Sequence, residues 1–280
     1  MMWTDLNRPP LCADNLRAAL VRGDEDSDPR KFWARLDVVQ ETGSTNADLL
    51  DRAARSECDR HVLLAEFQGS GRGRHSRVWV SPPQAQIAVS VLLTMPGMSV
   101  GAMGWLPLLT GVAVVDSLRD VAKVAAEMKW PNDVLIDGRK VAGILAEVAT
   151  TTPDPKVVVG IGLNVSLTRE ELPVEHATSL VLEDAEVSDR DTLVRAVLRA
   201  IAHRWQQWHD SNWDVADLAE AYRARCGTLG RRVRVELPGG RELSGVATDV
   251  DREGRLVITP DGQGEPVSVS AGDITHLRPV

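Results

Sequence analysis

Hydrophobic residues along the chain form two patterns, short runs rich in β-branched residues and longer stretches with helical spacing. The short runs are typical of strands, because a buried strand carries few polar positions. We expect strands at Val62 to Phe67, Ile87 to Leu93, Val134 to Ile136, Val141 to Val148 and Val157 to Leu163.

Three longer stretches predict helices, at Met103 to Val121, Thr192 to Trp208 and Val215 to Arg225. In the second of them the apolar residues recur every three or four positions, so they lie on one face of the helix. These residues are Leu193, Val197, Leu198, Ile201, Trp205 and Trp208. We interpret this face as one that packs against the core.

The two ends of the chain differ from its middle. Residues 1–36 are polar and include a charged stretch, Arg22 to Lys31, so we expect an extension with one short helix at Asn15 to Val21. This extension is too short for an independent winged-helix DNA-binding domain. After Gly227 the sequence alternates apolar and polar residues, with turns at Pro238-Gly239-Gly240, Asp251 to Gly254 and Asp261-Gly262. We therefore expect a main domain at 37–227 and a small SH3-like β-barrel at 228–280.

Composition narrows the classes of function. The formal net charge of -8 and the pI near 5.3 disfavour broad adsorption to nucleic acid or anionic lipid, since both need a basic surface. The three cysteines, Cys12, Cys58 and Cys226, show no zinc-ligand spacing and predict buried or inert thiols. Residues 1–16 lack the apolar core of a signal peptide, and no apolar run reaches membrane-spanning length, so we expect a cytoplasmic protein without a membrane partner.

A glycine-rich and arginine-rich segment, Gln68 to Arg77, follows the first expected strand directly. Its glycines at alternate positions let the backbone approach a ligand, while Arg72, Arg74 and Arg77 offer planar donors suited to phosphate or carboxylate. It is not a P-loop, because no Gly-Lys-Ser/Thr follows. By itself the segment predicts either an anion-binding loop, or a solvated turn or weak RNA contact.

A second motif is Lys129-Trp130-Pro131-Asn132-Asp133. Pro131 disfavours helical geometry at Trp130, so Lys129 and Asn132 are expected on an extended or turn segment at the entrance of a strand. Lys129 there is either a surface residue or a compact positive charge for a ligand, and Trp130 is expected to pack in the core.

Small and polar residues mark two further segments. The strand that ends in Gly160-Ile161-Gly162-Leu163-Asn164 is not a Rossmann fingerprint, because Val165 takes the place of a third glycine. Its glycines either leave room for a flat ligand, with Asn164 as a polar contact, or mark a bulge. In Glu41 to Asn46, Ser44 or Thr45 either caps the helix that follows or holds a polar ligand group.

Taken together and in this order, these segments closely resemble the biotin protein ligases over residues 37–280. The resemblance rests on Thr42 to Asn46, Gly71 to His75 with Arg77 and Trp79, Lys129 to Asp133, Lys140 to Leu145, and Gly160 to Asn164. It implies an α+β fold, with a class II synthetase-like mixed β-sheet flanked by helices, and an SH3-like barrel after it. It also implies a ligase of the monofunctional type, without an N-terminal DNA-binding domain.

The resemblance assigns roles to individual residues. Ser44, Thr45 and Gln68 would bind the ureido ring of biotin, beside Gly71, Arg72, Gly143, Gly160 and Gly162. Arg74 and Arg77 would clamp nucleotide phosphates, with Asn132, Lys140 and Asn164 on the nucleotide side. Lys129, between the biotin carboxylate and the α-phosphate, and Arg74 would be catalytic. The metal ligands and the adenine contacts stay unassigned, since Val165 to Leu180 holds no tryptophan.

The implied reaction uses biotin and ATP with Mg²⁺ to form biotinyl-5'-AMP, and then acylates a lysine of the biotin carboxyl carrier protein domain of acyl-CoA carboxylases. A carboxylate near a triphosphate meets repulsion of about 4 kcal/mol for each unit charge pair at about 4 Å in a dielectric near 20, which these cations would offset. Because the mixed anhydride hydrolyses easily, we expect residues 69–77 to become ordered over it when biotin binds.

Three alternatives differ in what they require. A lipoyl or octanoyl protein ligase would share the fold and the lysine, but the arginine-rich loop and the small C-terminal barrel favour biotin. A non-catalytic biotin sensor or carrier would not need Lys129 or the arginines. A nucleic-acid-binding protein is disfavoured by the acidic net charge. The sequence does not indicate an oligomeric state, and Asp133 is either a helper in the acyl transfer or a structural carboxylate.

Overall fold

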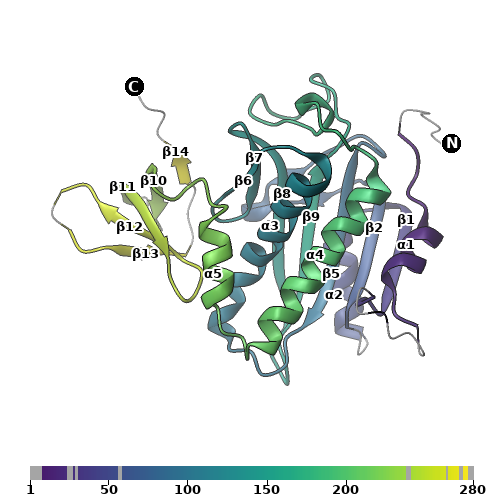
Figure 1. Cartoon of the computed structure of the whole chain (residues 1–280), viewed down its shortest axis with the longest axis horizontal. Helices are drawn as coiled ribbons and strands as arrows, with labels where there is room; N and C mark the ends of the chain where they lie inside the picture. The colour runs from purple at the N-terminus through teal and green to yellow at the C-terminus, as the bar shows by residue number, and fades with distance from the viewer. Residues whose placement is uncertain are drawn as a thin grey trace.

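The computed structural model describes residues 8–23, 28, 31–55, 59–237, 241–262, 264–270 and 274–276. Its centre is a seven-stranded mixed sheet in the order β1-β2-β5-β9-β8-β7-β6, in which only β1 and β2 pair in parallel (Figure 1). The strands are β1 (Arg35–Thr42), β2 (His61–Gln68), β5 (Gln86–Thr94), β6 (Ala126–Lys129), β7 (Asp133–Ile136), β8 (Arg139–Thr150) and β9 (Lys156–Asn164). Two short strands, β3 (Gly71–Arg72) and β4 (Val78–Trp79), form a separate ribbon.

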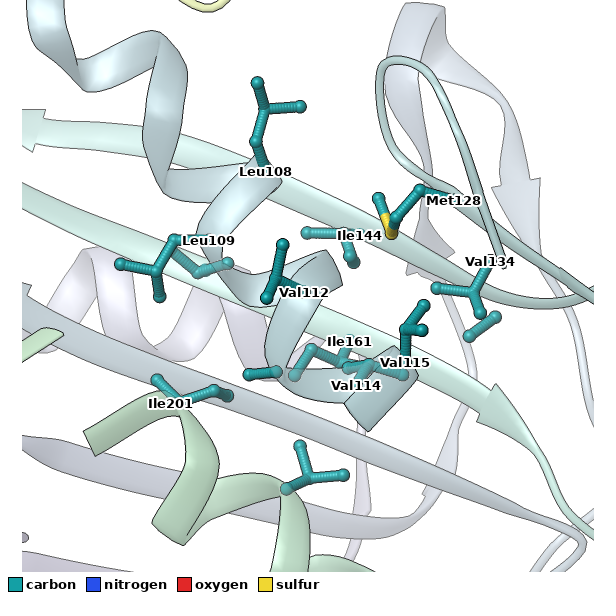
Figure 2. Packing of buried hydrophobic residues seen from close by; sticks show 14 of the residues in the cluster. Leu108, Leu109, Val112, Val114, Val115, Met128, Val134, Ile144, Ile161 and Ile201 are labelled. Atoms are coloured by element: carbon teal, nitrogen blue, oxygen red, sulfur yellow. The ribbon is translucent and has the colours of Figure 1, made fainter. Parts of the chain in front are cut away.

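Helices cover both faces of the large sheet. Helices α3 (Trp105–Ser117) and α4 (Arg190–Asp210) pack on one face, where valine and leucine side chains of α3 meet Met128, Val134, Ile144 and Ile161 (Figure 2). Helix α2 (Thr45–Arg55) covers the opposite face, because its Leu49 clusters with Leu63, Leu92 and Val158. The other helices are α1 (Ala13–Leu20), α5 (Ala216–Arg223) and the short turns η1 (Arg74–Ser76), η2 (Val100–Gly104), η3 (Leu118–Ala122) and η4 (Val181–Glu183).

The helical stretch Val100–Ala122 corrects one expectation. Among the described residues, it is long and apolar enough to cross a membrane by length and composition, although the sequence was expected to hold no such run. Most of the stretch is buried inside the protein, since α3 packs against the sheet on one side and against α4 on another. Its apolar character is therefore explained by its place in the core.

The C-terminal part is a five-stranded antiparallel sheet in the order β13-β12-β11-β10-β14. Its strands are β10 (Arg232–Leu237), β11 (Arg241–Val250), β12 (Leu256–Pro260), β13 (Val267–Val269) and β14 (Ile274–His276). The expected all-β character is confirmed, whereas closure into a barrel stays a prediction. The expected turn at Pro238-Gly239-Gly240 lies outside the described residues, and the turn that ends at Gly254 is present, with the glycine at φ +77°.

The five expected strands and three expected helices are present, with ends shifted by a few residues. The helix of the extension is α1, at Ala13–Leu20 rather than at Asn15 to Val21. The prediction for the cysteines holds for Cys226, which is buried, but Cys12 is exposed, and Cys58 lies outside the described residues. Strands β1 and β6 have no counterpart among the expected elements.

Candidate active site

A cavity of about 530 Å³ opens at one end of the large sheet. Its wall is built from the start of α2, the segment around η1, the β6–β7 turn, the strands β8 and β9, and residues of the segment 173–177. Of the residues singled out in the sequence, the wall contains Ser44, Thr45, Gln68, Arg72, Arg74, Arg77, Lys129, Asn132, Lys140, Gly143, Gly160, Gly162 and Asn164. Motifs spread over more than a hundred residues thus meet in one place.

Gly71 differs from the other candidates because it is not part of the cavity wall. It pairs with Trp79 in the β3–β4 ribbon, and a Cβ atom at Gly71 would overlap the carbonyl oxygen of Trp79. The glycine therefore allows two backbone segments to approach each other, and it acts on the cavity through the placement of Trp79.

A chain of polar groups lines the end of the cavity at α2. The Thr45 N–H and hydroxyl both donate to Gln68 Oε1, at 2.9 and 3.0 Å, and the Thr45 hydroxyl lies 2.6 Å from Ser90 Oγ. Ser90 donates to Asn46 Oδ1 at 2.6 Å. Ser44 caps α2, since its Oγ accepts from the Ala47 N–H at 3.5 Å. The hydroxyls therefore both start the helix and line the cavity, so the two interpretations of this motif are compatible.

The strand glycines form a floor beneath two side chains. A Cβ atom at Gly162 would lie 2.5 Å from Trp79 Cε2, and one at Gly143 would lie 3.0 Å from Trp79 Cζ3. At Gly160 a Cβ atom would overlap the amide of Asn46. The pairing of β9 is continuous at Gly160 and Gly162, so a bulge does not explain these glycines. These positions are glycines because Trp79 and Asn46 pack directly on the backbone and leave no room for a Cβ atom.

The opposite end of the cavity is cationic. Lys140 forms an ion pair with Asp133 at 2.5 Å, and its Nζ lies 5.4 Å from the ring centre of Trp79. Arg74 donates to Asn132 Oδ1 at 3.1 Å. Arg72 lies near α2 instead, because it pairs at 3.0 Å with Glu147, which also accepts from Asn46 Nδ2 at 2.8 Å. Asn132 belongs to the cavity wall, so a bound anion would compete with it for the Arg74 guanidinium group.

Two residues next to Arg74 have left-handed backbone conformations, with φ of +53° at His75 and +60° at Ser76. Such conformations are unfavourable for residues with a Cβ atom. Strain of this kind is common in segments that rearrange when a ligand binds.

Comparison with known proteins identifies the family to which this protein belongs. Residues 39–164 match the Biotin/lipoate A/B protein ligase family, and residues 228–277 match the Biotin protein ligase C terminal domain. A Biotin-[acetyl-CoA-carboxylase] ligase of Mycobacterium tuberculosis is 47% identical over 278 residues, which cover 98% of both chains. The chain belongs to the biotin protein ligase family.

Two further biotin ligases are also similar to this protein, one in sequence and one in structure. The bifunctional ligase/repressor BirA of Escherichia coli is 30% identical over 82% of this chain and 70% of BirA. The solved structure of the biotin protein ligase from Aquifex aeolicus in complex with biotin and ATP has a TM-score of 0.72 at 26% identity, covering 88% of this chain and all of that one. The resemblance, the enzyme class and the α+β fold expected from the sequence are confirmed.

Asn46, Trp79 and Ser90 are among the cavity residues that had no role in the sequence interpretation. Asn46 and Trp79 belong to motifs that carry the family resemblance, but a linear pattern does not reveal that they pack on glycines of another strand. Ser90 is hidden within an apolar run, where its only signal is a single hydroxyl among Val89, Val91 and Leu92.

Proposed function

We propose that the protein activates biotin with ATP as biotinyl-5'-AMP and transfers the biotinyl group to a lysine of a biotin carboxyl carrier protein. The observation that carries this proposal is the cavity itself, which joins a hydrogen-bonding end at Thr45 and Gln68 to a cationic end at Lys129, Arg74 and Lys140. Its volume of about 530 Å³ lies in the range of small-molecule sites.

The polar end suits the ureido ring of biotin. That ring presents N–H donors and a carbonyl acceptor, so it needs both kinds of partner in a narrow space. Ser44 and Thr45 supply hydroxyls that both donate and accept, and Gln68 supplies an amide. The apolar tetrahydrothiophene ring of biotin would lie against Trp79, which covers the glycine floor.

The cationic end suits the triphosphate. In the first step a biotin carboxylate oxygen attacks the α-phosphorus of ATP, an acyl–phosphate bond forms and pyrophosphate leaves. Lys129 and Arg74 would lower the repulsion between carboxylate and phosphates and stabilise the charge that builds up on the phosphoryl oxygens. Arg77, Asn132, Lys140 and Asn164 would contact the nucleotide.

In the second step a lysine amine of the carrier attacks the biotinyl carbonyl, and AMP leaves. The curated relative at 47% identity is named for acetyl-CoA carboxylase, which supports the carrier domain of an acyl-CoA carboxylase as the acceptor. We also propose that the reaction takes place in the cytoplasm.

Magnesium would enter as the complex with ATP. Among the described residues there is no group of three or more His, Cys, Asp or Glu side chains placed to hold a metal ion. This fits a cation whose ligands are mainly phosphate oxygens and water, as is usual for Mg²⁺ in nucleotide sites. There it would neutralise part of the phosphate charge.

Mass spectrometry tests the proposal. A biotin carboxyl carrier domain is incubated with the purified protein and Mg-ATP in parallel reactions with biotin, lipoate or octanoate. We expect one biotinyl addition on a lysine, and no addition with the Lys129→Ala variant. Transfer of lipoate or octanoate instead of biotin would show that the protein is a ligase for a different acid. If no acid were transferred, the proposal would be contradicted.

A further inference from the structure

Lys129 ends β6, the strand at one edge of the large sheet. The outer side of this strand contacts residues 225–228, a segment that follows α5 and leads to β10, called the linker below. The Met128 N–H donates to Arg225 O at 2.8 Å, and the Gly227 N–H donates to Met128 O at 2.9 Å. The linker therefore extends the sheet beyond its edge strand, directly before Lys129.

The residue after Lys129 is held by the linker as well. The Trp130 N–H donates to the hydroxyl of Thr228 at 3.0 Å, and Thr228 is fully buried. A side chain thus takes the place of a strand partner for this backbone N–H group. If the hydroxyl were lost, the N–H would be buried without a partner unless the backbone moved, because water does not reach it.

The indole ring of Trp130 makes a second connection to the C-terminal part. It is 2% exposed, and its Nε1 donates at 3.0 Å to the carbonyl of Gly254, in the turn between β11 and β12. Trp105, the first residue of α3, donates to Arg252 O in the same turn at 2.8 Å. Two indoles therefore hold one turn, but only Trp130 is adjacent to Lys129 in the chain.

We propose that Thr228 and Trp130 are positioning residues, through which the linker and the C-terminal sheet hold Lys129 in place at the cavity. The inference rests on the proposed function, because it takes Lys129 as the residue that contacts the reacting groups in the formation of biotinyl-5'-AMP. It gives the C-terminal part a role in the first chemical step, in addition to any role in stability or carrier docking.

The geometry separates binding from catalysis. The hydrogen-bonding end of the cavity, at Thr45, Gln68 and Ser90, has no contact with Thr228 in the described hydrogen bonds. A shift of Lys129 would leave that end intact but would displace the ammonium group from the position it needs in the transition state. Misplacement by about 1 Å can lower a rate by about a hundredfold.

The first test compares Thr228→Val with Thr228→Ser in steady-state, biotin-dependent exchange of pyrophosphate into ATP, which reports the formation of biotinyl-5'-AMP. Thr228→Val keeps the shape but removes the acceptor, and we expect its kcat to fall about tenfold or more while KM for biotin changes little. Thr228→Ser keeps the hydroxyl and should recover most of the rate. Thr110→Val is the matched control, because the buried Thr110 hydroxyl donates to Leu106 O within α3 and not to the backbone next to Lys129.

A wild-type rate in Thr228→Val would overturn the inference. So would an equal loss in Thr228→Val and Thr110→Val, or the absence of rescue by serine. An inactive wild-type protein would instead refute the proposed function, so the two failures are distinguishable.

A second pair of variants is available if Thr228→Val does not fold. Trp130→Phe and Trp105→Phe each remove one indole donor to the same turn. We expect Trp130→Phe to lower kcat by about tenfold or more, and Trp105→Phe to leave it near the wild-type value. Equal effects of the two substitutions on kcat would show that the turn only supports the fold and would overturn the positioning role.

Discussion

Gly162 lies directly beneath the indole ring of Trp79, so that a Cβ atom on the glycine would come within 2.5 Å of the ring. The Gly162→Ala substitution therefore has to push Trp79 away from its place in the cavity, at a cost of about 1–3 kcal/mol. If the ring contacts biotin as proposed and the same free energy is lost from binding, the Kd for biotin should rise by roughly 5- to 150-fold.

Isothermal titration calorimetry with biotin measures this effect. Gly264→Ala is a suitable control, since a Cβ atom at Gly264 would meet its nearest neighbour at 3.4 Å, an ordinary contact, and the residue lies in the C-terminal part. An unchanged affinity in Gly162→Ala would show that biotin binding does not depend on the position of Trp79.

Arg190 and Glu66 form a buried ion pair at 2.7 Å, with side chains only 6% and 3% exposed. The pair also anchors the N-terminal segment, because Glu66 accepts from the Leu11 N–H and Arg190 donates to Pro9 O, both at 2.6 Å. Arg190→Met leaves the carboxylate buried without its cation, so the free energy of unfolding should fall by about 3–5 kcal/mol in urea denaturation.

The exposed pair of Arg55 with Asp51 provides the control for this experiment. Its side chains are 78% and 71% exposed. Arg55→Met should therefore change the free energy of unfolding by less than about 1 kcal/mol. Equal urea midpoints for Arg190→Met and the wild type would contradict a stabilising role for the buried pair.

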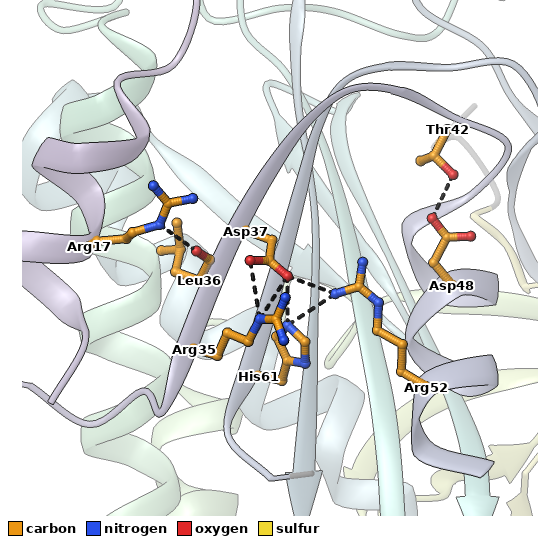
Figure 3. Close-up of polar contacts among 8 residues, drawn as sticks. All are labelled: Arg17, Arg35, Leu36, Asp37, Thr42, Asp48, Arg52 and His61. Carbon is orange, nitrogen blue, oxygen red and sulfur yellow. Dashed lines mark hydrogen bonds and ion pairs between the residues drawn. The ribbon is translucent and has the colours of Figure 1, made fainter. Parts of the chain in front are cut away.

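His61 Nε2 lies 3.1 Å from Asp37 Oδ2 (Figure 3), and both groups make the stability of the protein depend on pH. Burial, together with the nearby charges of Arg52 and Arg35, lowers the pKa of His61 below its ordinary value of 6.5 against the opposing effect of Asp37. Burial raises the pKa of Asp37, but hydrogen bonds from Arg35, His61 and Arg52 outweigh it, so this pKa lies below 3.8. In the folded state both groups thus bind protons less tightly than in the unfolded chain.

As a consequence, the free energy of unfolding decreases on acidification in two separate pH ranges. The contribution of His61 is complete above pH 6.5 and decreases as the pH falls through this value, whereas the contribution of Asp37 is complete above pH 3.8 and decreases below it. His61→Gln should remove the contribution of His61, so the free energy of unfolding should decrease less between about pH 7.5 and 5.5. The same slope in the variant and the wild type would be contrary to this account.

The segment 69–77 should become protected when biotin binds. It carries the left-handed residues His75 and Ser76, whose strain favours a different conformation in the bound state. Hydrogen–deuterium exchange with peptide-level resolution should show slower exchange in this segment with saturating biotin, while the buried strand β9 stays unchanged. Unchanged exchange in the segment would rule out ordering by biotin.

The sequence was a good guide where local pattern determines structure. The five apolar runs became strands, because continuous runs of Val, Ile and Leu leave little choice but a buried sheet position. Strand β1 was missed because Arg35–Thr42 is mostly polar and only half-buried, and β6 because Ala126–Lys129 is four residues long without a β-branched residue. Both lie at sheet edges, where pairing rather than pattern makes the strand.

In the candidate site, too, the local sequence pattern predicted some features and not others. Motif residues indicated which side chains would meet at the cavity, yet the closest contacts within it join distant segments, such as Asn46 on Gly160 and Trp79 on Gly162. Likewise, nothing in the pattern around Thr228 indicates that its hydroxyl binds the backbone next to Lys129. The domain borders at 37 and 228 and the individual ligand contacts remain predictions.

The most direct test of the central claim is biotin-dependent exchange of pyrophosphate into ATP, measured without any carrier protein. We expect exchange by the wild type that requires both biotin and Mg²⁺, and a rate at least about a hundredfold lower in Lys129→Ala. An absence of biotin-dependent exchange in the folded wild-type protein would contradict the formation of biotinyl-5'-AMP, and an undiminished rate in Lys129→Ala would contradict the catalytic role of Lys129.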